Sequence, residues 1–240
     1  VRESGEAGFL RRLATSRVLS SKPTIVDVGA HTGEYIEIAK ETWPDARIFG
    51  FEPSASHYER LSAFLRERKY VGVKTYPIGL SSEAGTRTLS KHENISGMAS
   101  LEARDLQHLG IEMTIREEVT LAQLDDVMAR EGIDTIDLLK IDIEGHELSC
   151  LKGATGLING RKIKIVQYEY GHAHVASKNS VQDFFNFFRP NGYVMGVIKP
   201  TGRLAFFERY DEFLELFLAS NYVAVLPEIA VKFGYKNAAA

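Results

Sequence analysis

The sequence predicts an α/β fold with a mostly parallel central sheet, helices on both faces and a C-terminal antiparallel hairpin. Short β-branched runs alternate with segments whose apolar residues recur at helical spacing, a pattern typical of parallel strands joined by right-handed crossovers. The first run, 24–28, breaks into a glycine-containing turn, and the second, 47–51, is followed by a glutamate. With 240 residues and no internal repeat or linker, residues 1–240 are expected to form a single domain.

The first half of the chain supplies the first strands and their crossover helices. Residues 1–22 carry apolar side chains among arginines and are interpreted as an N-terminal helical cap on the sheet. Trp43-Pro44-Asp45 marks the end of the first crossover helix. The expected order is strand 24–28, helix 34–41, strand 47–51, helix 54–68 and strand 71–78.

The segment 79–120 departs from this rhythm and is interpreted as an inserted antiparallel hairpin with its loop. Strands are expected at 86–89 and 117–121, and a small-residue loop surrounds Ser96, Met98 and Ser100. Beyond it we expect a helix at 122–130, a strand at 136–143, a helix at 148–157, a strand at 163–170, a helix at 181–189 and a hairpin of 193–198 with 203–207.

Composition excludes some classes of protein. A net charge of −3 with 25% charged residues gives no sign of a nucleic-acid partner, and no apolar run approaches the ~20 residues of a membrane-spanning helix. The lone Cys150 lies in an apolar stretch and is interpreted as core, which favours a reducing compartment and a cytoplasmic location. The missing start methionine and the terminal Ala238–Ala240 indicate either a piece of a longer protein or vector-derived residues.

The turn after the first strand indicates the cofactor. Glycines at 29 and 33 allow a sharp turn and a close approach to a ligand, but the middle glycine of a dinucleotide fingerprint is absent. The turn instead resembles motif I of class I S-adenosylmethionine-dependent methyltransferases. Asp27 is expected to face the methionine amino group, directly or through water, and Glu52 to accept hydrogen bonds from both ribose hydroxyls. A tight turn of some other α/β domain is the structural alternative.

A second polar cluster follows the buried run 138–141. Asp142 and Glu144 are two residues apart, so both face one side if the strand continues. They could serve as a general base toward a substrate hydroxyl, as hydrogen-bond acceptors or as ligands of a divalent cation. His146 titrates near neutral pH and is either a base or a cap of the following helix. Lys140 shares the alternation phase of Asp142 and is a candidate ion-pair partner.

A third polar cluster ends the strand at 163–170. Glu169 and His172 are expected to face the same crevice, where with Asp142 they could form an acid–base or metal-binding group. Their spacing is not diagnostic of a metal, so no metal ligand is assigned. A divalent cation, direct substrate binding and solvated loop residues remain alternatives.

Several motifs together resemble the FkbM family of methyltransferases over about 24–190. These are Val26-Asp27-Val28-Gly29-Ala30-His31-Thr32-Gly33, Phe51-Glu52-Pro53, Leu124-Asp125-Asp126, Asp137-Leu138-Leu139-Lys140-Ile141-Asp142-Ile143-Glu144-Gly145-His146-Glu147 and Leu151-Lys152-Gly153-Ala154. The resemblance implies a Rossmann-like class I methyltransferase that uses S-adenosylmethionine, releases S-adenosylhomocysteine and methylates a hydroxyl of a sugar, glycolipid, polysaccharide or polyketide-type product. The implied acceptor is a small molecule or a glycan.

The resemblance also implies roles for individual residues. The implied cofactor-binding residues are Asp27, Gly29, Ala30, His31, Thr32, Gly33, Glu52, Pro53, Gly79, Leu80, Ser81 and Asp142. The candidate catalytic residues are Asp142, Glu144, His146, Glu169 and His172. Two other functions stay open: a non-catalytic methyltransferase-like domain that binds a cofactor or a partner within a larger protein, and an oxidoreductase acting on nucleotide sugars.

Overall fold

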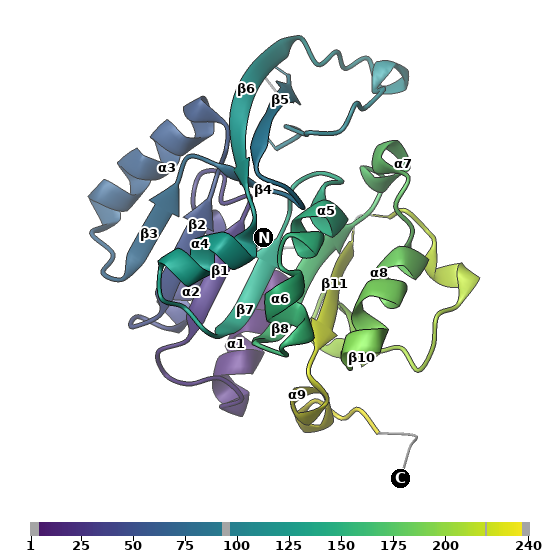
Figure 1. Ribbon diagram of the computed structural model, residues 1–240. Helices are drawn as coiled ribbons and strands as arrows, with labels where there is room; N and C mark the ends of the chain where they lie inside the picture. The colour runs from purple at the N-terminus through teal and green to yellow at the C-terminus, as the bar shows by residue number, and fades with distance from the viewer. Residues whose placement is uncertain (1–4, 93–96, 219, 237–240) are drawn as a thin grey trace.

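The computed structural model describes residues 5–92, 97–218 and 220–236, and in that part of the chain the strands form a large central sheet and a small second one (Figure 1). The large sheet has eight strands in the order β10-β9-β11-β8-β7-β1-β2-β3. The five strands from β8 to β3 are parallel, as the sequence predicts. The bounds are β1 (Thr24–Val28), β2 (Arg47–Phe51), β3 (Val73–Tyr76), β7 (Ile136–Ile141), β8 (Ile163–Tyr170), β9 (Val194–Ile198), β10 (Leu204–Phe206) and β11 (Ser220–Val225).

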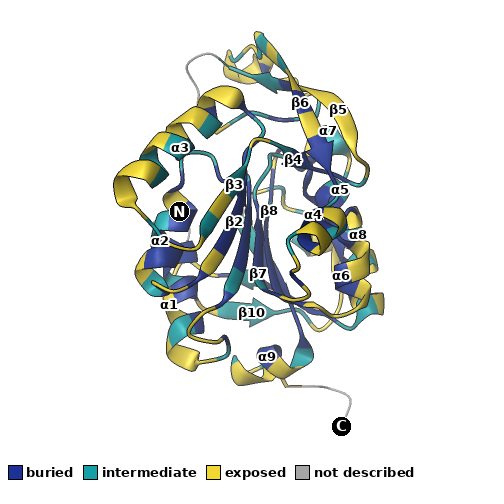
Figure 2. Ribbon diagram, turned by 60° about the vertical axis from the view of Figure 1, so that its left-hand side comes forward, coloured by how far each residue is buried: buried dark blue, intermediate teal, exposed yellow. Residues whose placement is uncertain are grey.

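Helices cover both faces of this sheet, so its strands are the most buried part of the molecule (Figure 2). Val26 and Val28 of β1 belong to one apolar core, and Ile25 between them belongs to the other, because side chains alternate along a strand. The first core includes residues of α4 (Leu124–Arg130), α5 (Glu147–Lys152), α6 (Thr155–Asn159) and α8 (Val181–Phe188). The second includes residues of α1 (Glu6–Ser16), α2 (Glu34–Thr42), α3 (Ala55–Arg68) and α9 (Pro227–Lys232).

The segment 79–122 carries the second sheet, which rises beyond the carboxyl ends of the parallel strands (Figure 1). Its strands are β4 (Gly79–Leu80), β5 (Gly85–Lys91) and β6 (Ile115–Ala122). β5 and β6 pair antiparallel, and β4 pairs with the end of β6. Of the loop between β5 and β6, Met98 and Ser100 are described, whereas Ser96 lies outside the described residues. We call 97–106 the insert loop below.

Two predicted elements have different bounds in the structure. The strand expected to reach residue 143 ends at Ile141, because Glu144 and Gly145 adopt positive φ angles of 55° and 101°. The helix expected at 148–157 is divided into α5 and α6 around Gly153. A Cβ at this glycine would collide with the carbonyl oxygen of Ser81, so the close approach of β4 requires a glycine there.

The closing hairpin of β9 and β10 is present, but β11 and α9 were not expected from the sequence. β11 lies between β8 and β9 and is antiparallel to both, so the hairpin stands at the sheet edge. β11 has a polar start, Ser220-Asn221, and only a short apolar run, which gives a weak strand signal.

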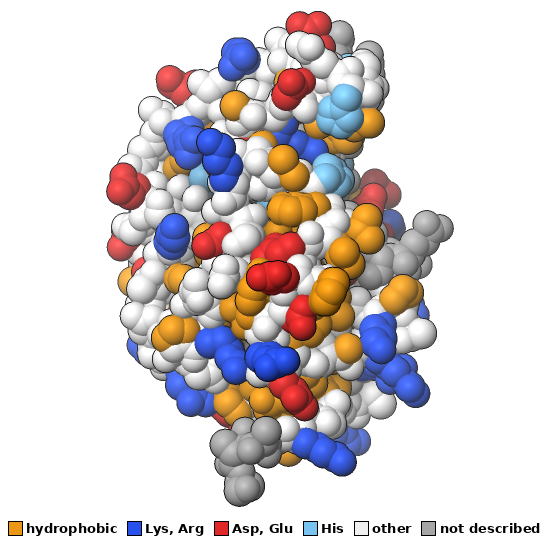
Figure 3. All heavy atoms as spheres, turned by 90° about the vertical axis from the view of Figure 1, so that its right-hand side faces the viewer, with side chains coloured by type: hydrophobic (Ala, Val, Ile, Leu, Met, Phe, Trp, Pro, Cys, Tyr) orange, Lys and Arg blue, Asp and Glu red, His pale blue; other side chains and the backbone are white. Residues whose placement is uncertain are grey.

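In the described part of the chain, no helix is long and apolar enough to cross a membrane. The face over α7 (His174–Ser177), α8 and the segment before β11 mixes hydrophobic side chains with charges of both signs (Figure 3). Val175, Phe213, Leu216 and Leu218 are among its exposed hydrophobic residues.

Candidate active site

A cavity of about 340 Å³ lies at the carboxyl ends of β1, β2, β7 and β8 and beneath the insert loop. Ligands of open α/β sheets bind at this edge, and the volume lies within the range of small-molecule sites. Its lining residues from the sheet side include Gly29, Ala30, His31, Glu52, Pro53, Gly79, Leu80, Lys140, Asp142, Glu144 and Glu169. The insert contributes Leu89, Gly97, Ala99 and Leu101.

The turn from β1 to α2 forms one wall. Gly29 has a φ of 83°, and a Cβ there would collide with the carbonyl oxygen of Asp142, so glycine is needed for the ends of β1 and β7 to meet. His31 lines the cavity with a φ of 48° and packs edge-on against His57 with ring centroids 4.4 Å apart. Thr32 and Gly33 are not among the lining residues, and Gly33 faces the side chains of Leu61 and Phe64 in the core.

Glu52, which follows the end of the neighbouring strand β2, lies directly beside this turn. One carboxylate oxygen accepts the backbone N–H of His31 at 2.9 Å, and the other accepts that of Ser54 at 2.9 Å. Each oxygen keeps a second lone pair, and the residue lines the cavity although only 5% of its surface is exposed. Glu52 is therefore a fixed, charged acceptor of two further hydrogen bonds. Pro53 lies beside it.

β4 supplies Gly79 and Leu80 to the lining, but not Ser81. The hydroxyl of Ser81 instead hydrogen bonds to His146 Nε2 at 2.9 Å. Of these three predicted cofactor-binding residues, Gly79 and Leu80 line the cavity and Ser81 does not, and their role in cofactor binding stays a prediction.

Asp27 is not among the residues that line the cavity, and its expected orientation toward the methionine amino group, directly or through water, stays a prediction. It is completely buried, and Asp27 Oδ1 lies 3.3 Å from Lys140 Nζ, its cross-strand neighbour on β7. Lys140 lines the cavity, and its ammonium also lies 3.6 Å from Asp142 Oδ2. Burial opposes the charge on Lys140, but the carboxylates of Asp27, Asp142 and Glu6 outweigh it and raise the pKa. Lys140 thus separates Asp27 from the cavity.

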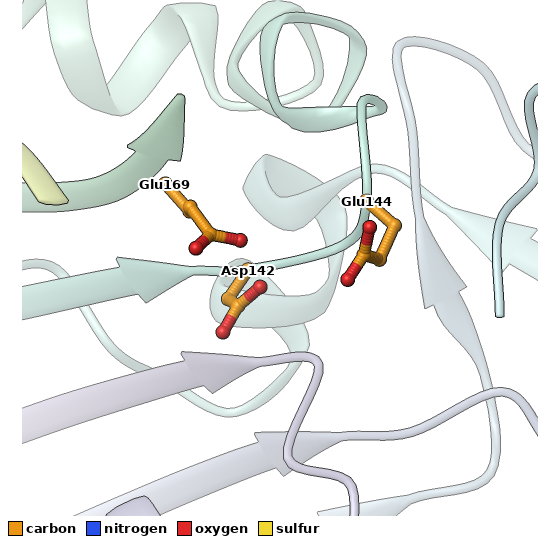
Figure 4. Close-up of side chains that lie close together, drawn as sticks. All are labelled: Asp142, Glu144 and Glu169. Carbon is orange, nitrogen blue, oxygen red and sulfur yellow. The ribbon is translucent and has the colours of Figure 1, made fainter. Parts of the chain in front are cut away.

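Three carboxylates meet at the floor of the cavity (Figure 4). Asp142 and Glu144 come from the turn after β7, and Glu169 comes from β8; one oxygen of each lies within 4.8 Å of the others. The strand does not continue to Glu144 as the sequence prediction assumed, but the turn still brings it to the cavity. Asp142 pairs with Lys140, and Glu144 pairs with Arg104 at 2.6 Å.

Burial changes the proton affinity of two of these groups. It raises the pKa of Glu144 to about 7, against the lowering effect of Arg104. It raises the pKa of Glu169 to about 8, and the neighbouring carboxylates of Asp142, Glu144 and Glu147 add to the rise. Oxygen donors of this kind can hold a divalent cation, but cations already lie against Asp142 and Glu144. This charge balance favours proton exchange over metal binding.

His146 and His172 do not join the three carboxylates. Both ring nitrogens of His146 are engaged, Nδ1 with Glu102 at 2.6 Å and Nε2 with Ser81, and only 1% of the residue is exposed. It therefore cannot reach an acceptor in the cavity as a base. His146 is the N-cap residue of α5, but its side chain makes no cap hydrogen bond either. His172 is exposed and borders a smaller depression beside Glu144 and Glu169, outside the main cavity.

Other lining residues were not found by sequence reasoning. His57 of α3 and Tyr35 of α2 line the cavity, but each lies inside a helical pattern that gives no sign of a site. Leu89, Ala99 and Leu101 reach the cavity only because the insert folds back over the sheet.

Comparison with known proteins identifies the family. Residues 27–195 match the family model described as the methyltransferase FkbM domain. The chain is 35% identical over 159 residues to methyltransferase sdnD of Sordaria araneosa, covering 56% of this chain and 61% of that protein. It is 28% identical over 181 residues to the 31-O-demethyl-FK506 methyltransferase FkbM of Streptomyces tacrolimicus, covering 62% of this chain and 69% of that protein.

A solved structure agrees with these matches in fold. The methyltransferase FkbM structure from Methylobacillus flagellatus superposes with a TM-score of 0.54 at 18% identity, covering 86% of this chain and 44% of that one. The chain matches about three fifths of the length of the first of these relatives, sdnD. Because the family model covers most of the chain, this protein belongs to the FkbM family of methyltransferases.

Proposed function

We propose that the cavity binds S-adenosylmethionine and that the protein transfers its methyl group to a hydroxyl of a small molecule or glycan. The residues present fit this cofactor. Glu52 is held by two backbone donors and has free lone pairs for a pair of ribose hydroxyls. The turn at Gly29 and Ala30 and the pair Gly79 and Leu80 give a small-residue wall against which a nucleoside can lie.

The position of the methionine end follows from the charges. Among the residues that line the cavity, Lys140 offers a cation and Asp142 a carboxylate, which can pair with the carboxylate and the amino group of an amino acid. Asp27 supports this site through its ion pair with Lys140, whose ammonium lies 3.3 Å from Asp27 Oδ1.

The three carboxylates carry the proposal of hydroxyl methylation. When bound, the cofactor supplies an electrophilic methyl group, and the bond from this carbon to sulfur breaks as its bond to the acceptor oxygen forms. The acceptor hydroxyl loses its proton in the same reaction, so a base must lie within hydrogen-bond reach of it. Asp142, Glu144 and Glu169 line the cavity together, and the pKa values of Glu144 and Glu169 are raised to about 7 and about 8, so this group can take up the proton and release it to water.

The name of one relative supports an oxygen as the methylated atom. The S. tacrolimicus protein is named as a 31-O-demethyl-FK506 methyltransferase, so the substrate in its name lacks a methyl group on an oxygen. Apolar residues of the insert, Leu89 and Leu101, line the cavity opposite the carboxylates, which suits an acceptor with an apolar face next to its hydroxyl.

Transfer of a labelled methyl group to a panel of sugars, glycolipids and polyketide-type alcohols tests this proposal. We expect turnover of at least one acceptor and a loss of about 10²-fold or more in kcat when the base is removed. Asp142→Asn, Glu144→Gln and Glu169→Gln, singly and together, identify it. Full activity of the triple variant at every pH contradicts the proposed chemistry. Cofactor binding without turnover of any acceptor instead supports the non-catalytic alternative.

A further inference from the structure

The turn that carries Glu144 is held from two sides. Glu144 has a φ of 55°, a left-handed conformation that costs a non-glycine residue about 1–3 kcal/mol and needs support from its surroundings. On the inner side, Glu147 accepts the backbone N–H groups of Ile143 at 2.8 Å and Gly145 at 2.9 Å. On the outer side, the supporting groups come from the insert loop.

Three contacts join the insert loop to residues 144–146. The hydroxyl of Ser100 donates to the carbonyl oxygen of Glu144 at 2.7 Å, and Arg104 Nη1 lies 2.6 Å from Glu144 Oε2. Glu102 lies 2.6 Å from His146 Nδ1, and its own backbone N–H donates to Ser100 Oγ at 3.0 Å. Two of the contacts fall on Glu144 and the third on His146, so three residues of the insert loop hold both ends of this short segment.

Arg104 is committed to this contact. Only 2% of its side chain is exposed, and its Nη2 has no hydrogen-bond partner among the residues that the structure describes. A buried guanidinium with a single carboxylate partner is left uncompensated when that partner is removed or displaced, which destabilises the folded state. Arg104 and Glu144 therefore stabilise each other's position. Residues 142–147 include no lysine or arginine that could take the place of Arg104.

We propose that Arg104 is a positioning residue for Glu144, through which the insert loop fixes this carboxylate in the proton-accepting cluster. The inference rests on the proposed function, because it concerns how one of the proposed bases is held. It explains why an insertion remote in sequence from β7 contacts the active-site turn three times. The charged groups that face Glu144 are Asp142 of its own turn, Glu147 of α5, Glu169 of β8 and Arg104 of the insert loop.

The pKa of Glu144 gives a readout that does not need an acceptor. Burial raises the pKa of Glu144, and the carboxylates of Asp142 and Glu147 add to the rise, whereas Arg104 lowers it. The loss of Arg104 should therefore raise the pKa of Glu144 further. We would follow the Glu144 carboxyl by carbon NMR in wild type, Arg104→Gln and Arg104→Lys, with assignment from Glu144→Gln. The matched control is Arg116→Gln, which replaces an exposed arginine on β6.

The expected result is that the titration of Glu144 moves up by about one pH unit in Arg104→Gln. Arg104→Lys keeps the positive charge but loses the planar guanidinium, so the Glu144 titration should lie between those of wild type and Arg104→Gln. Arg116→Gln should leave it unchanged. A Glu144 titration unchanged in Arg104→Gln and in Arg104→Lys overturns the inference. If Arg104→Gln does not fold, Arg104→Lys alone provides the comparison, and a Glu144 titration identical to that of wild type in this variant overturns the inference.

Turnover then separates this inference from the proposed function. We expect Arg104→Gln to lower kcat about tenfold or more with cofactor affinity changed less than about twofold, and to have no further effect in a Glu144→Gln background. An equal loss in both backgrounds means that Arg104 acts independently of Glu144, which overturns the inference. Failure of wild type to bind S-adenosylmethionine contradicts the proposed function but leaves the NMR comparison intact.

Discussion

Glu144 and Glu169 differ in proton affinity because their neighbours differ. Glu144 has a cation at 2.6 Å, whereas the stated neighbours of Glu169 are all carboxylates, and accordingly the pKa of Glu169 is higher, about 8 against about 7. The pKa values of two glutamates thus differ because their surroundings differ, as is common in acid–base sites.

The rate of methyl transfer should rise with pH between about 6 and 8. The base must be unprotonated to accept the acceptor proton, and the pKa values of about 7 and 8 place that loss of protons in this range. The measurement is kcat/KM against pH for a proven acceptor. A rise centred near the ordinary carboxyl pKa, or a flat profile, would contradict the assignment.

Folding stability should fall as the pH rises from about 4.5 to about 8. The pKa of Glu169 is raised in the folded state, so the folded protein binds this proton more tightly than the unfolded chain between about pH 4.5 and 8. The resulting stabilisation is present below about pH 4.5 and is lost as pH rises toward 8. Glu169→Gln should therefore raise the free energy of unfolding by about 1–2 kcal/mol at pH 8.5, with little change at pH 4.5.

Thermal unfolding at both pH values measures this difference. A matched control is Glu118→Gln on β6, which replaces an exposed glutamate. An equal increase in the free energy of unfolding from both substitutions at pH 8.5, or a decrease in Glu169→Gln, would contradict this prediction.

Sequence reasoning identified site residues that terminate strands and missed those that come from elsewhere. Glu52, Asp142 and Glu169 follow directly from the rule that parallel strands end at one edge. Arg104 and His57 could not be found in this way, because a loop contact over forty residues of chain and a side chain on a helix leave no local pattern. The sequence pattern placed Asp27 on the first strand, but its pairing with Lys140 across two strands could be seen only in the folded sheet.

At the scale of elements, the junction of β1 with β7 is the most constrained. Gly29 combines a φ of 83° with backbone contact to Asp142, so two separate requirements exclude a side chain. Gly29→Ala should cost about 2 kcal/mol or more in the free energy of unfolding, whereas Gly132→Ala should cost about 1 kcal/mol. Gly132 also has a positive φ, 66°, but open space around its Cβ position.

Urea unfolding of the two variants isolates the close contact from the backbone strain. A cost for Gly29→Ala no larger than that for Gly132→Ala would show that the approach of Asp142 does not constrain the turn.

The order of strands and helices could be predicted because each buried strand is a short β-branched run and each crossover helix has its own apolar face. β11 could not, since its pairing with β8 and β9 depends on the rest of the sheet being formed. The division of α5 from α6 likewise depends on a tertiary contact, between Gly153 and Ser81. Local patterns therefore indicated the elements, and long-range contacts decided their final bounds.

For the whole molecule, the fold assembles one site from distant parts of the chain. β1, β2, β7 and β8 bring their carboxyl ends to one edge of the sheet, and the insert closes over that edge (Figure 1). The family relationship explains the fold, and the charges in the cavity support the proposed cofactor and reaction. The central claim is that Glu52 holds the ribose of S-adenosylmethionine in this cavity.

Calorimetric titration with S-adenosylhomocysteine tests this claim most directly. We expect saturable binding at one site in wild type and in Glu118→Gln, and affinity weaker by about tenfold or more in Glu52→Gln, since a charged acceptor of two hydrogen bonds is lost. Absence of binding to the folded wild type, or equal affinity in Glu52→Gln, would contradict the account.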